Sequence, residues 1–242
     1  KLLELKNISL YDKKNIRIKN INLIVNEGEK IALIGKSGAG KSTLISIANG
    51  SLFPNEGTVI WKDQNIKSIS KKESSKIGTI WQDLSLIEEL NVAQNINCGA
   101  LGKHNFLWAL KNLLGILDKE LCQECLAAVC LPKKSIYSHI SKLSGGQKKR
   151  IAIARLLRQE PEIVLGDEPF SNLDPLLSKN ILNLLINEKQ YFSIKIPKTI
   201  LISLHQINLI HNFNRVIGMK DGRIVIDKPI KDIDPLKINS IF

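Results

Sequence analysis

The chain has 242 residues, of which 43% are hydrophobic and 24% are charged, and its formal net charge is +12. This length and composition favour an α/β globular protein with a sizeable core and exclude a low-complexity chain. No apolar run reaches the length of a membrane span, and the N-terminal residues do not have the pattern of a signal peptide. We therefore expect a cytoplasmic protein, which can still sit on a membrane through a partner.

The positive charge does not follow the pattern of a nucleic-acid binder. Lysines are scattered singly or in pairs, without a basic run and without interleaved aromatic residues. We expect no nucleic-acid partner, and we interpret the charge as a generic basic surface that suits anionic lipid headgroups.

Residues 1–26 alternate between apolar and polar side chains, which predicts antiparallel strands with one solvated face. Tyr11 lies at the expected turn between these strands. An aromatic side chain in this place suits stacking on an adenine ring, and an ordinary strand-end tyrosine fits the spacing equally well.

A glycine-rich loop follows the short buried strand expected at Lys30–Ile34. It matches the phosphate-loop pattern at every required position, which are Gly35, Lys36, Ser37, Gly38, Ala39, Gly40, Lys41 and Ser42. In such a loop the backbone N–H groups hold phosphate, the lysine meets the β- and γ-phosphates, and the serine hydroxyl holds Mg²⁺. Thr43 continues into a helix, and the N-terminus of a helix favours phosphate. We therefore expect a triphosphate and Mg²⁺ at this loop.

Strands are expected at Thr58–Trp61 and Ile77–Trp81, and Gln82 follows the second of them. Helical spacing then takes over, so that a helical lobe at about 88–142 is expected within a catalytic core formed by 1–87 and 143–242. Phe106–Leu110 is apolar on nearly all sides, which leaves two alternatives: burial in the lobe or docking of a partner.

The four cysteines do not indicate a metal site. Cys122 and Cys125 have a metal-like spacing, but they lie in a run with helical apolar periodicity and no neighbouring histidine. We favour small buried thiols in a reducing compartment for these two residues and for Cys98 and Cys130.

A second phosphate-binding device is expected at Ser144, Gly145, Gly146 and Gln147, which precede a helix. Ser144 is a good helix N-cap, and the two glycines free the backbone for close approach to an anion. One triphosphate needs only one loop, so this second device suggests a site completed by another copy of the chain.

Acidic residues follow the next expected strand, Glu162–Gly166. Asp167 is the expected holder of Mg²⁺, and the Glu168 carboxylate suits the orientation of an attacking water. Thr199–Ser203 is a further buried strand, and a hairpin is expected around Asp221-Gly222. In an open parallel sheet, ligands lie beyond the carboxyl ends of the strands, and four candidate residues are placed in this way: Gly35, Gln82, Asp167 and His205.

These motifs together resemble the ATP-binding cassette (ABC) ATPases over essentially the whole chain. The resemblance rests on Leu143–Gln147 lying between a phosphate loop and the strand that ends in Asp167 and Glu168. It implies an α/β phosphate-loop fold with an antiparallel β subdomain and an inserted helical subdomain. It also implies a head-to-tail homodimer that holds ATP between the loop of one copy and Ser144–Gln147 of the other.

The resemblance implies further roles for single residues. Gln82 touches Mg²⁺ and the attacking water, His205 contacts the γ-phosphate, Asp174 crosses the dimer interface, and Tyr11 stacks on adenine. Lys41, Gln82, Glu168 and His205 thereby form the catalytic set.

A finer similarity is to the ATPases of bacterial phosphonate importers, a branch that also serves phosphite. It rests on Ser203–Gln206, on Arg215–Asp227 and on the lobe segment Asn95–Gly102. It implies an ATPase at the cytoplasmic face of the inner membrane, bound through its lobe to transmembrane permease subunits and served by a periplasmic solute-binding protein. The alternative is the ATPase of another importer, an exporter, or a lipoprotein-release or cell-division complex. The segment Tyr191–Pro197 is unusually apolar, and the sequence offers no account of it.

Overall fold

The computed structural model describes residues 1–12, 15–171, 173–187 and 193–233. The chain forms two compact units. The first unit contains residues 1–70, 163–168 and the chain from residue 198 onward, and the second contains residues 71–162 and 169–197. No helix within the described ranges is long and apolar enough to cross a membrane.

An antiparallel sheet begins the first unit and confirms the prediction for residues 1–26. Its strand order is β2-β1-β4-β5, and the strands are β1 (Leu3–Asp12), β2 (Asn15–Val25), β4 (Glu56–Trp61) and β5 (Gln64–Asn65). Leu3 and Leu5 are buried on either side of the half-buried Glu4, which follows the period of two of a sheet with one buried face. The alternation breaks at Lys6 and Asn7, which are both exposed, because the pairing of β1 with β2 shifts register between Leu5 and Ile8.

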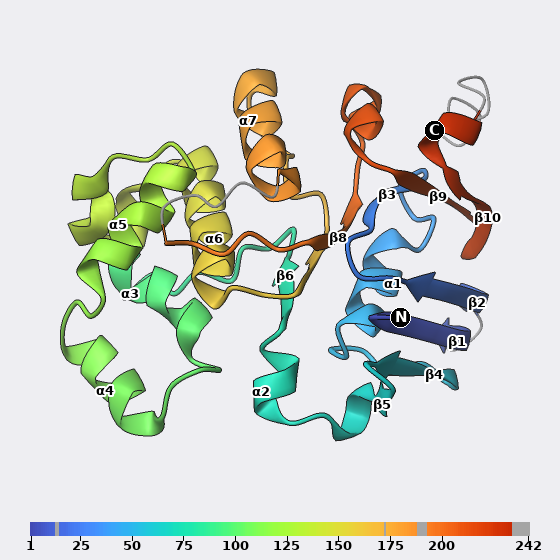
Figure 1. Ribbon diagram of the computed structural model, residues 1–242, viewed down its shortest axis with the longest axis horizontal. Helices are drawn as coiled ribbons and strands as arrows, with labels where there is room; N and C mark the ends of the chain where they lie inside the picture. Colours follow the sequence, from blue (N-terminus) through green and yellow to red (C-terminus); the bar gives the residue numbers. More distant parts are fainter. Residues whose placement is uncertain (13–14, 172, 188–192, 234–242) are drawn as a thin grey trace. The chain divides into compact units, whose positions relative to one another are not determined.

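A mainly parallel sheet forms the core of the first unit (Figure 1). Strand β3 pairs in parallel with β8 and β9, and β8 pairs in parallel with β7. The strands are β3 (Lys30–Ile34), β7 (Ile163–Gly166), β8 (Thr199–Ser203), β9 (Arg215–Lys220) and β10 (Arg223–Pro229). Helix α1 (Lys41–Ala48) contacts both β2 and β7. The predicted strands and their burial are confirmed here.

The hairpin of β9 and β10 turns at Asp221 and Gly222, as predicted. Both residues have positive φ, 48° and 73°. A two-residue turn with positive φ at both positions matches the twist of antiparallel strands. The strands pair antiparallel from Lys220 and Arg223 onward.

The second unit is mainly helical. Helices α3, α5 and α6 contact one another, and α4 contacts α3 (Figure 1). Its elements are α2 (Lys71–Ser74), β6 (Ile77–Ile80), α3 (Val92–Asn97), α4 (Phe106–Leu114), α5 (Lys119–Ala128), α6 (Gly145–Gln159) and α7 (Pro175–Ile186). Short 3₁₀ segments lie between them at Cys98–Ala100, Lys133–Tyr137 and Ile140–Lys142.

Helix α4 turns its apolar face to solvent and a polar side chain to the interior. Phe106, Leu107 and Leu114 are 78%, 64% and 82% exposed, whereas Asn112 is 2% exposed. Burial of Phe106–Leu110 in the lobe, one of the two predicted alternatives, is therefore wrong.

Buried amides hold α4 in this orientation. The side chain of Gln94 donates to the backbone oxygens of Asn112 and Leu113, at 2.9 and 3.1 Å. Asn97 donates to the Asn112 side chain at 3.0 Å, and Asn112 donates to the Gln94 backbone oxygen at 3.2 Å. Directional hydrogen bonds therefore position α4 on α3. Apolar packing alone would define the rotation of α4 about its axis less well.

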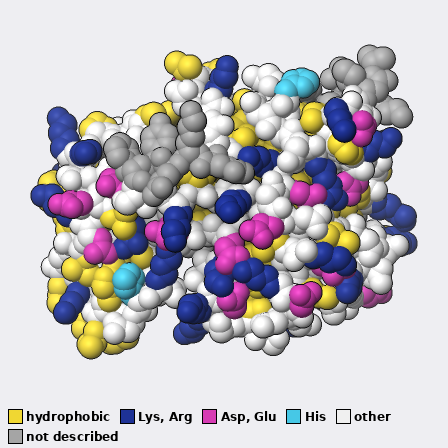
Figure 2. Space-filling model, in the orientation of Figure 1, with side chains coloured by type: hydrophobic (Ala, Val, Ile, Leu, Met, Phe, Trp, Pro, Cys, Tyr) yellow, Lys and Arg dark blue, Asp and Glu magenta, His cyan; other side chains and the backbone are white. Residues whose placement is uncertain are grey.

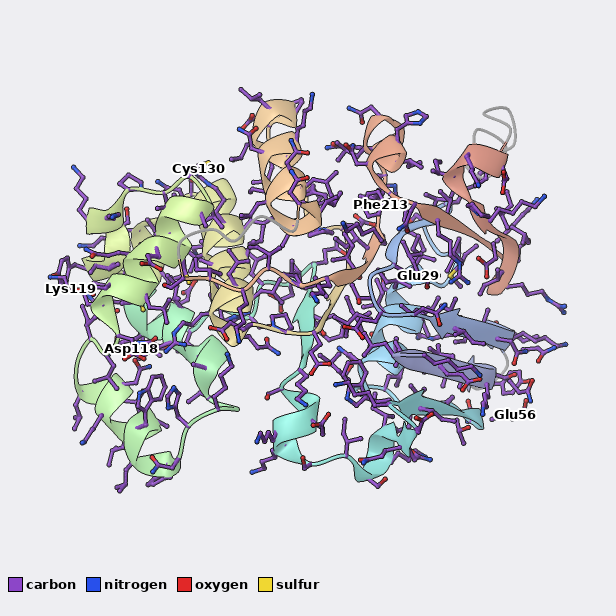
Figure 3. The ribbon with its side chains drawn as sticks, in the orientation of Figure 1. Glu29, Glu56, Asp118, Lys119, Cys130 and Phe213 are labelled. Carbon is purple, nitrogen blue, oxygen red and sulfur yellow. The ribbon has the colours of Figure 1, made fainter. Side chains whose placement is uncertain are left out.

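The same amide cluster reaches α6. Arg158, which is 5% exposed, donates from Nε to Asn97 at 3.2 Å and pairs with Asp118 at 2.5 Å. Asp118 lies at the start of α5 (Figure 3). One buried guanidinium thus links α3, α5 and α6.

The cysteines follow the prediction in part. Cys122 and Cys125 are buried, and burial raises the pKa of each thiol to about 12. Both side chains are therefore neutral thiols in the packed interior. Cys98 is only half-buried and Cys130 is exposed, so the expected burial is wrong for Cys130, which lies just beyond the end of α5 with a left-handed φ of 58°.

Residues 193–197 belong to the second unit and pack against its helices. Ile194 is 1% exposed and Pro197 is buried, and the Ser193 hydroxyl donates to Glu124 on α5. Burial on the second unit accounts for the apolar character of this part of the segment, and residues 191–192 lie outside the described ranges.

We predict that Asn97→Ala lowers the free energy of unfolding by about 1–3 kcal/mol, because it leaves buried polar groups of Arg158 and Asn112 without their partner. Urea unfolding followed by circular dichroism measures the change. The control is Asn180→Ala on the exposed face of α7, which should stay within about 0.5 kcal/mol of the parent. Equal stability of the two variants would contradict the structural role of the cluster.

Candidate nucleotide-binding and catalytic site

The phosphate loop joins β3 to α1 and requires glycine at both ends. Gly35 is buried with φ at 152°, and a Cβ atom there would lie 2.4 Å from the backbone oxygen of Met219. Gly40 caps α1 in the left-handed region, with φ at 101°. Residues 36–38 are exposed between them. The backbone therefore makes a tight turn at the N-terminus of a helix, where N–H groups favour an anion.

Lys41 is a buried ammonium at the start of α1. It is 5% exposed, and Nζ donates to the backbone oxygens of Gly35 and Lys36 at 2.7 and 3.0 Å. Burial lowers the pKa of Lys41 below its ordinary value, and the nearby carboxylates of Glu168 and Asp167 act in the opposite direction. The loop thus holds a cation within reach of both acidic residues.

Three of the four candidate residues at strand ends lie on neighbouring parallel strands. Gly35 follows β3, Asp167 follows β7, and His205 lies just beyond β8, which pairs with both β3 and β7. The predicted placement at one edge of the sheet is confirmed for these three. Gln82 belongs to the second unit, where it is exposed and lies two residues beyond β6.

Ser203 is a residue of this site that the sequence analysis missed. It ends β8, is fully buried, and donates from its hydroxyl to Oδ1 of Asp167 at 3.0 Å. The same hydroxyl accepts from the backbone N–H of Glu168 at 2.9 Å. Ser203 therefore orients both acidic residues. The sequence signal that could have identified Ser203 is a hydroxyl residue at the carboxyl end of the strand that neighbours β7, the strand before Asp167 and Glu168.

Glu168 and His205 form a close pair. Nε2 of His205 lies 2.5 Å from Oε1 of Glu168. Glu168 has a left-handed φ of 48°, a conformation that costs a residue other than glycine about 1–3 kcal/mol and that is concentrated at functional sites. The strained backbone directs its carboxylate toward the end of β8.

Tyr11 lies within β1, just before the predicted turn. It is 37% exposed, and its hydroxyl donates to Oε2 of Glu56 at 3.3 Å. Glu56 is the first residue of β4 (Figure 3). The tyrosine is therefore only partly exposed, and the alternatives for Tyr11 stay open.

The second predicted phosphate device starts α6 in the second unit. Ser144 accepts from the backbone N–H of Gln147 at 3.3 Å, and the Gln147 side chain accepts from the backbone N–H of Ser144 at 2.9 Å. This reciprocal capping confirms the predicted N-cap. A Cβ on Gly145 would meet no atom within 4 Å, so the approach to this helix end is open.

Asp174 caps α7. Its carboxylate accepts from the backbone N–H of Leu177 at 2.9 Å, and Pro175 occupies the first helical position. The residue is exposed and lies in the second unit.

The comparisons with known proteins agree with this geometry. A family model described as ABC transporter matches residues 18–171. The chain therefore belongs to the ABC transporter family, and it carries that family's ATP-binding domain with the fold of an ABC ATPase cassette.

Relatives match over the full length of the chain. A protein named phosphonates import ATP-binding protein PhnC from Lactobacillus delbrueckii subsp. bulgaricus is 36% identical, and the alignment covers 100% of this chain and 94% of the relative. A protein of the same name from Nostoc sp. is 37% identical, with 99% and 91% covered. Among solved structures, the dimeric ATP-binding cassette MJ0796 bound to ADP and phosphate has a TM-score of 0.81 and 28% identity, with 96% of this chain and 100% of that chain covered.

We predict that Gly35→Ala raises the Kd for ATP at least about tenfold, because the added Cβ displaces the loop backbone. Titration with a fluorescent ATP analogue measures the affinity. Gly115→Ala is the control, since a Cβ there meets no atom within 4 Å, and its Kd should stay within about twofold of the parent. An unchanged Kd for Gly35→Ala would contradict the assignment of the loop.

Proposed function

We propose that this chain is the ATP-hydrolysing subunit of a bacterial ABC importer that carries phosphonate or phosphite across the inner membrane. The observation that carries the proposal is the full-length similarity, at 36–37% identity, to proteins named for phosphonate import. The geometry of the candidate site supports ATP hydrolysis, and the names of the relatives indicate the transported compound.

ATP is bound mainly by backbone groups and by Lys41. The N–H groups of residues 36–43 surround the β-phosphate, and the buried Lys41 ammonium stabilises charge on the transferring phosphoryl group. Tyr11 stacks on the adenine ring, which requires no base-specific hydrogen bond.

The oxygen donors present suit Mg²⁺. Ser42 is exposed at the start of α1, and Asp167 is a buried carboxylate oriented by Ser203. Mg²⁺ commonly takes one or two protein oxygens together with phosphate and water oxygens. When bound, the ion neutralises charge on the β- and γ-phosphates. Ser42 and Asp167 would hold it, with Gln82 as the third candidate.

Glu168 orients and polarises the attacking water. Its carboxylate is 2.5 Å from His205, so the imidazole fixes the orientation of the carboxylate and contacts the γ-phosphate. General-base positioning of this kind contributes about 10²–10⁴-fold to a rate.

A second copy of the chain completes the site. Ser144, Gly145, Gly146 and Gln147 of one copy bind the γ-phosphate held by the other, in a head-to-tail homodimer with two ATP molecules. The open approach to Gly145 and the dimeric state of the related cassette MJ0796 support this arrangement. Asp174 contacts the partner copy across the same interface.

The lobe formed by about 88–142 docks transmembrane permease subunits. The exposed apolar side chains of α4 support this proposal, and hydrophobic side chains gather over this helix in Figure 2. An apolar surface rimmed by polar residues is typical of a protein interface. The chain then works at the cytoplasmic face of the inner membrane, and a periplasmic solute-binding protein delivers the cargo to the permease.

We predict that Glu168→Gln lowers the ATP turnover rate by about 10²–10⁴-fold while ATP binding is kept, because the amide has the same shape and cannot polarise water. The unhydrolysed ATP should also trap the dimer, which gel filtration with light scattering detects. Glu120→Gln on the exposed side of α5 should turn over ATP like the parent. Normal hydrolysis by Glu168→Gln would overturn the role given to this carboxylate.

Uptake by the host cell tests the cargo. We predict that deletion of the gene abolishes uptake of radiolabelled methylphosphonate or phosphite, that the parent gene restores it, and that Glu168→Gln does not. Phosphate uptake in the same cells serves as the control and should persist. Unchanged uptake of both compounds, combined with Glu168-dependent ATP hydrolysis, would reject the cargo and leave the ATPase assignment intact.

A further inference from the structure

Lys149 is a buried lysine on α6 that the mechanism above does not use. It is 5% exposed. Its Nζ donates to the hydroxyl of Ser171 at 2.6 Å and to the backbone oxygen of the same residue at 3.0 Å. Burying an ammonium group is costly, and well-placed hydrogen bonds must compensate for the lost hydration. These two bonds join Lys149 to Ser171 and therefore hold Ser171 against α6.

The segment that Lys149 holds is central to the proposed site. Ser171 lies three residues after Glu168 and three before Asp174. Lys149 lies about one helical turn after Gly145 and Gly146, which begin α6. Lys149 therefore connects the helix that carries the second phosphate device to the stretch that leads from the catalytic glutamate to the interface aspartate.

A second contact joins the same two parts of the chain. A Cβ atom on Gly146 would lie 3.7 Å from Cδ2 of Leu173, so Leu173 approaches the first turn of α6 closely. Leu173 and Phe170 are themselves buried, at 8% and 2% exposure. Leu173 thus lies beside the first turn of α6, two residues after the Ser171 that Lys149 holds.

We propose that Lys149 is a positioning residue for ATP hydrolysis, which fixes Ser171 to α6. The proposal rests on the proposed function, because it concerns turnover at the site that two copies complete. Binding of the partner's nucleotide at Ser144–Gln147 pulls on the N-terminus of α6. Through Lys149 the same displacement reaches Ser171 and, along the chain, Glu168 and Asp174.

This role separates turnover from nucleotide binding. The residues that bind ATP within one copy, Tyr11 and residues 35–43, lie in the first unit, while Lys149 and Ser171 lie in the second. Loss of the Lys149 contact therefore lowers kcat and leaves the Kd for ATP unchanged. A residue that acts only by keeping the chain folded would instead lower stability, binding capacity and turnover together.

The adjacent lysine provides a matched control. Lys148 pairs with Glu88 at 3.1 Å, and its side chain is 25% exposed. Lys148→Met removes the same charge from the same helix turn without touching Ser171. A loss of turnover in Lys148→Met would show that positive charge at the start of α6 supports turnover. Normal turnover would show that the Ser171 contact is the feature that matters.

The experiment uses the full chain assembled with its membrane partners in lipid vesicles. We expect Lys149→Met to lower kcat for ATP at least about tenfold, with KM and the Kd for a fluorescent ATP analogue within about twofold of the parent. Lys148→Met should keep kcat within about twofold. Ser171→Ala, which removes the hydroxyl and keeps the backbone oxygen, should lower kcat by a smaller factor of about threefold.

The double variant Lys149→Met/Ser171→Ala decides whether the two residues act together. We expect its kcat to equal that of Lys149→Met alone, because the interaction is already lost. The proposal would be overturned if the fold-loss of kcat in the double variant equalled the product of the two single losses. It would also be overturned if Lys149→Met kept the parent's kcat, or if Lys148→Met lost as much kcat as Lys149→Met. If Lys149→Met does not fold, Lys149→Gln is compared with the double variant Lys149→Gln/Ser171→Ala in its place. A fold-loss of kcat in that double variant equal to the product of the two single losses again rejects the proposal.

Failure of this inference is distinguishable from failure of the proposed function. The assay measures ATP hydrolysis and needs no cargo. Loss of the phosphonate assignment would leave the kcat comparison valid, while normal turnover in Lys149→Met would leave the cargo and the role of Glu168 unaffected.

Discussion

The positions of the candidate site residues in the first unit depend on one constraint, which is that β3, β8 and β7 are parallel neighbours. Parallel neighbours end at the same edge, so the chain after each strand delivers its polar residues to a common place. Asp167 is buried there, so its carboxylate needs a partner in the protein. The Ser203 hydroxyl meets that need for two neighbours at once, by donating to Asp167 and accepting from the backbone of Glu168. The fold therefore fixes the acidic residues before any ligand binds.

The same requirement shapes the two anion-binding devices. Lys41 donates to backbone oxygens of its own loop, and Ser144 and Gln147 cap each other at the start of α6. The Lys41 ammonium, the Ser144 hydroxyl and the Gln147 side chain thus have hydrogen-bond partners within the folded chain. In the proposed function, phosphate would give Lys41 a charge-assisted partner in place of its backbone acceptors.

Much of this architecture could be predicted from the sequence, because it depends on local patterns. The run Lys30–Ile34 is apolar throughout and matches β3 residue for residue, and Ser144 and Asp174 both cap helices. The placement of Gly35, Asp167 and His205 at one sheet edge also follows from strand order in a parallel sheet. These predictions rely on period, capping chemistry and strand direction, which are readable without tertiary contacts.

Features that depend on contacts between distant residues could not be predicted. Phe106–Leu110 is apolar on nearly all sides, so the sequence left both burial and docking of a partner open. In the structure, Asn112 faces inward to Gln94 and Asn97, and the apolar side chains face outward. Ser203 and Lys149 were missed for the same reason, because a serine at a strand end and a lysine in a basic helix turn have no distinctive pattern. Their partners, Asp167 and Ser171, are 36 and 22 residues away in the chain.

The polar contacts of α6 explain why this helix is suited to relay movement. Lys149 near its N-terminus fixes the segment after Glu168, and Arg158 near its C-terminus joins the amides beneath α4. Both side chains are 5% exposed, so water competes little with their hydrogen bonds. A single helix of 15 residues therefore joins the segment that follows Glu168 to the amides that hold α4. In the proposed function, displacement of α4 by a docked permease subunit would reach Ser171 through α6, because hydrogen bonds hold both ends of this helix.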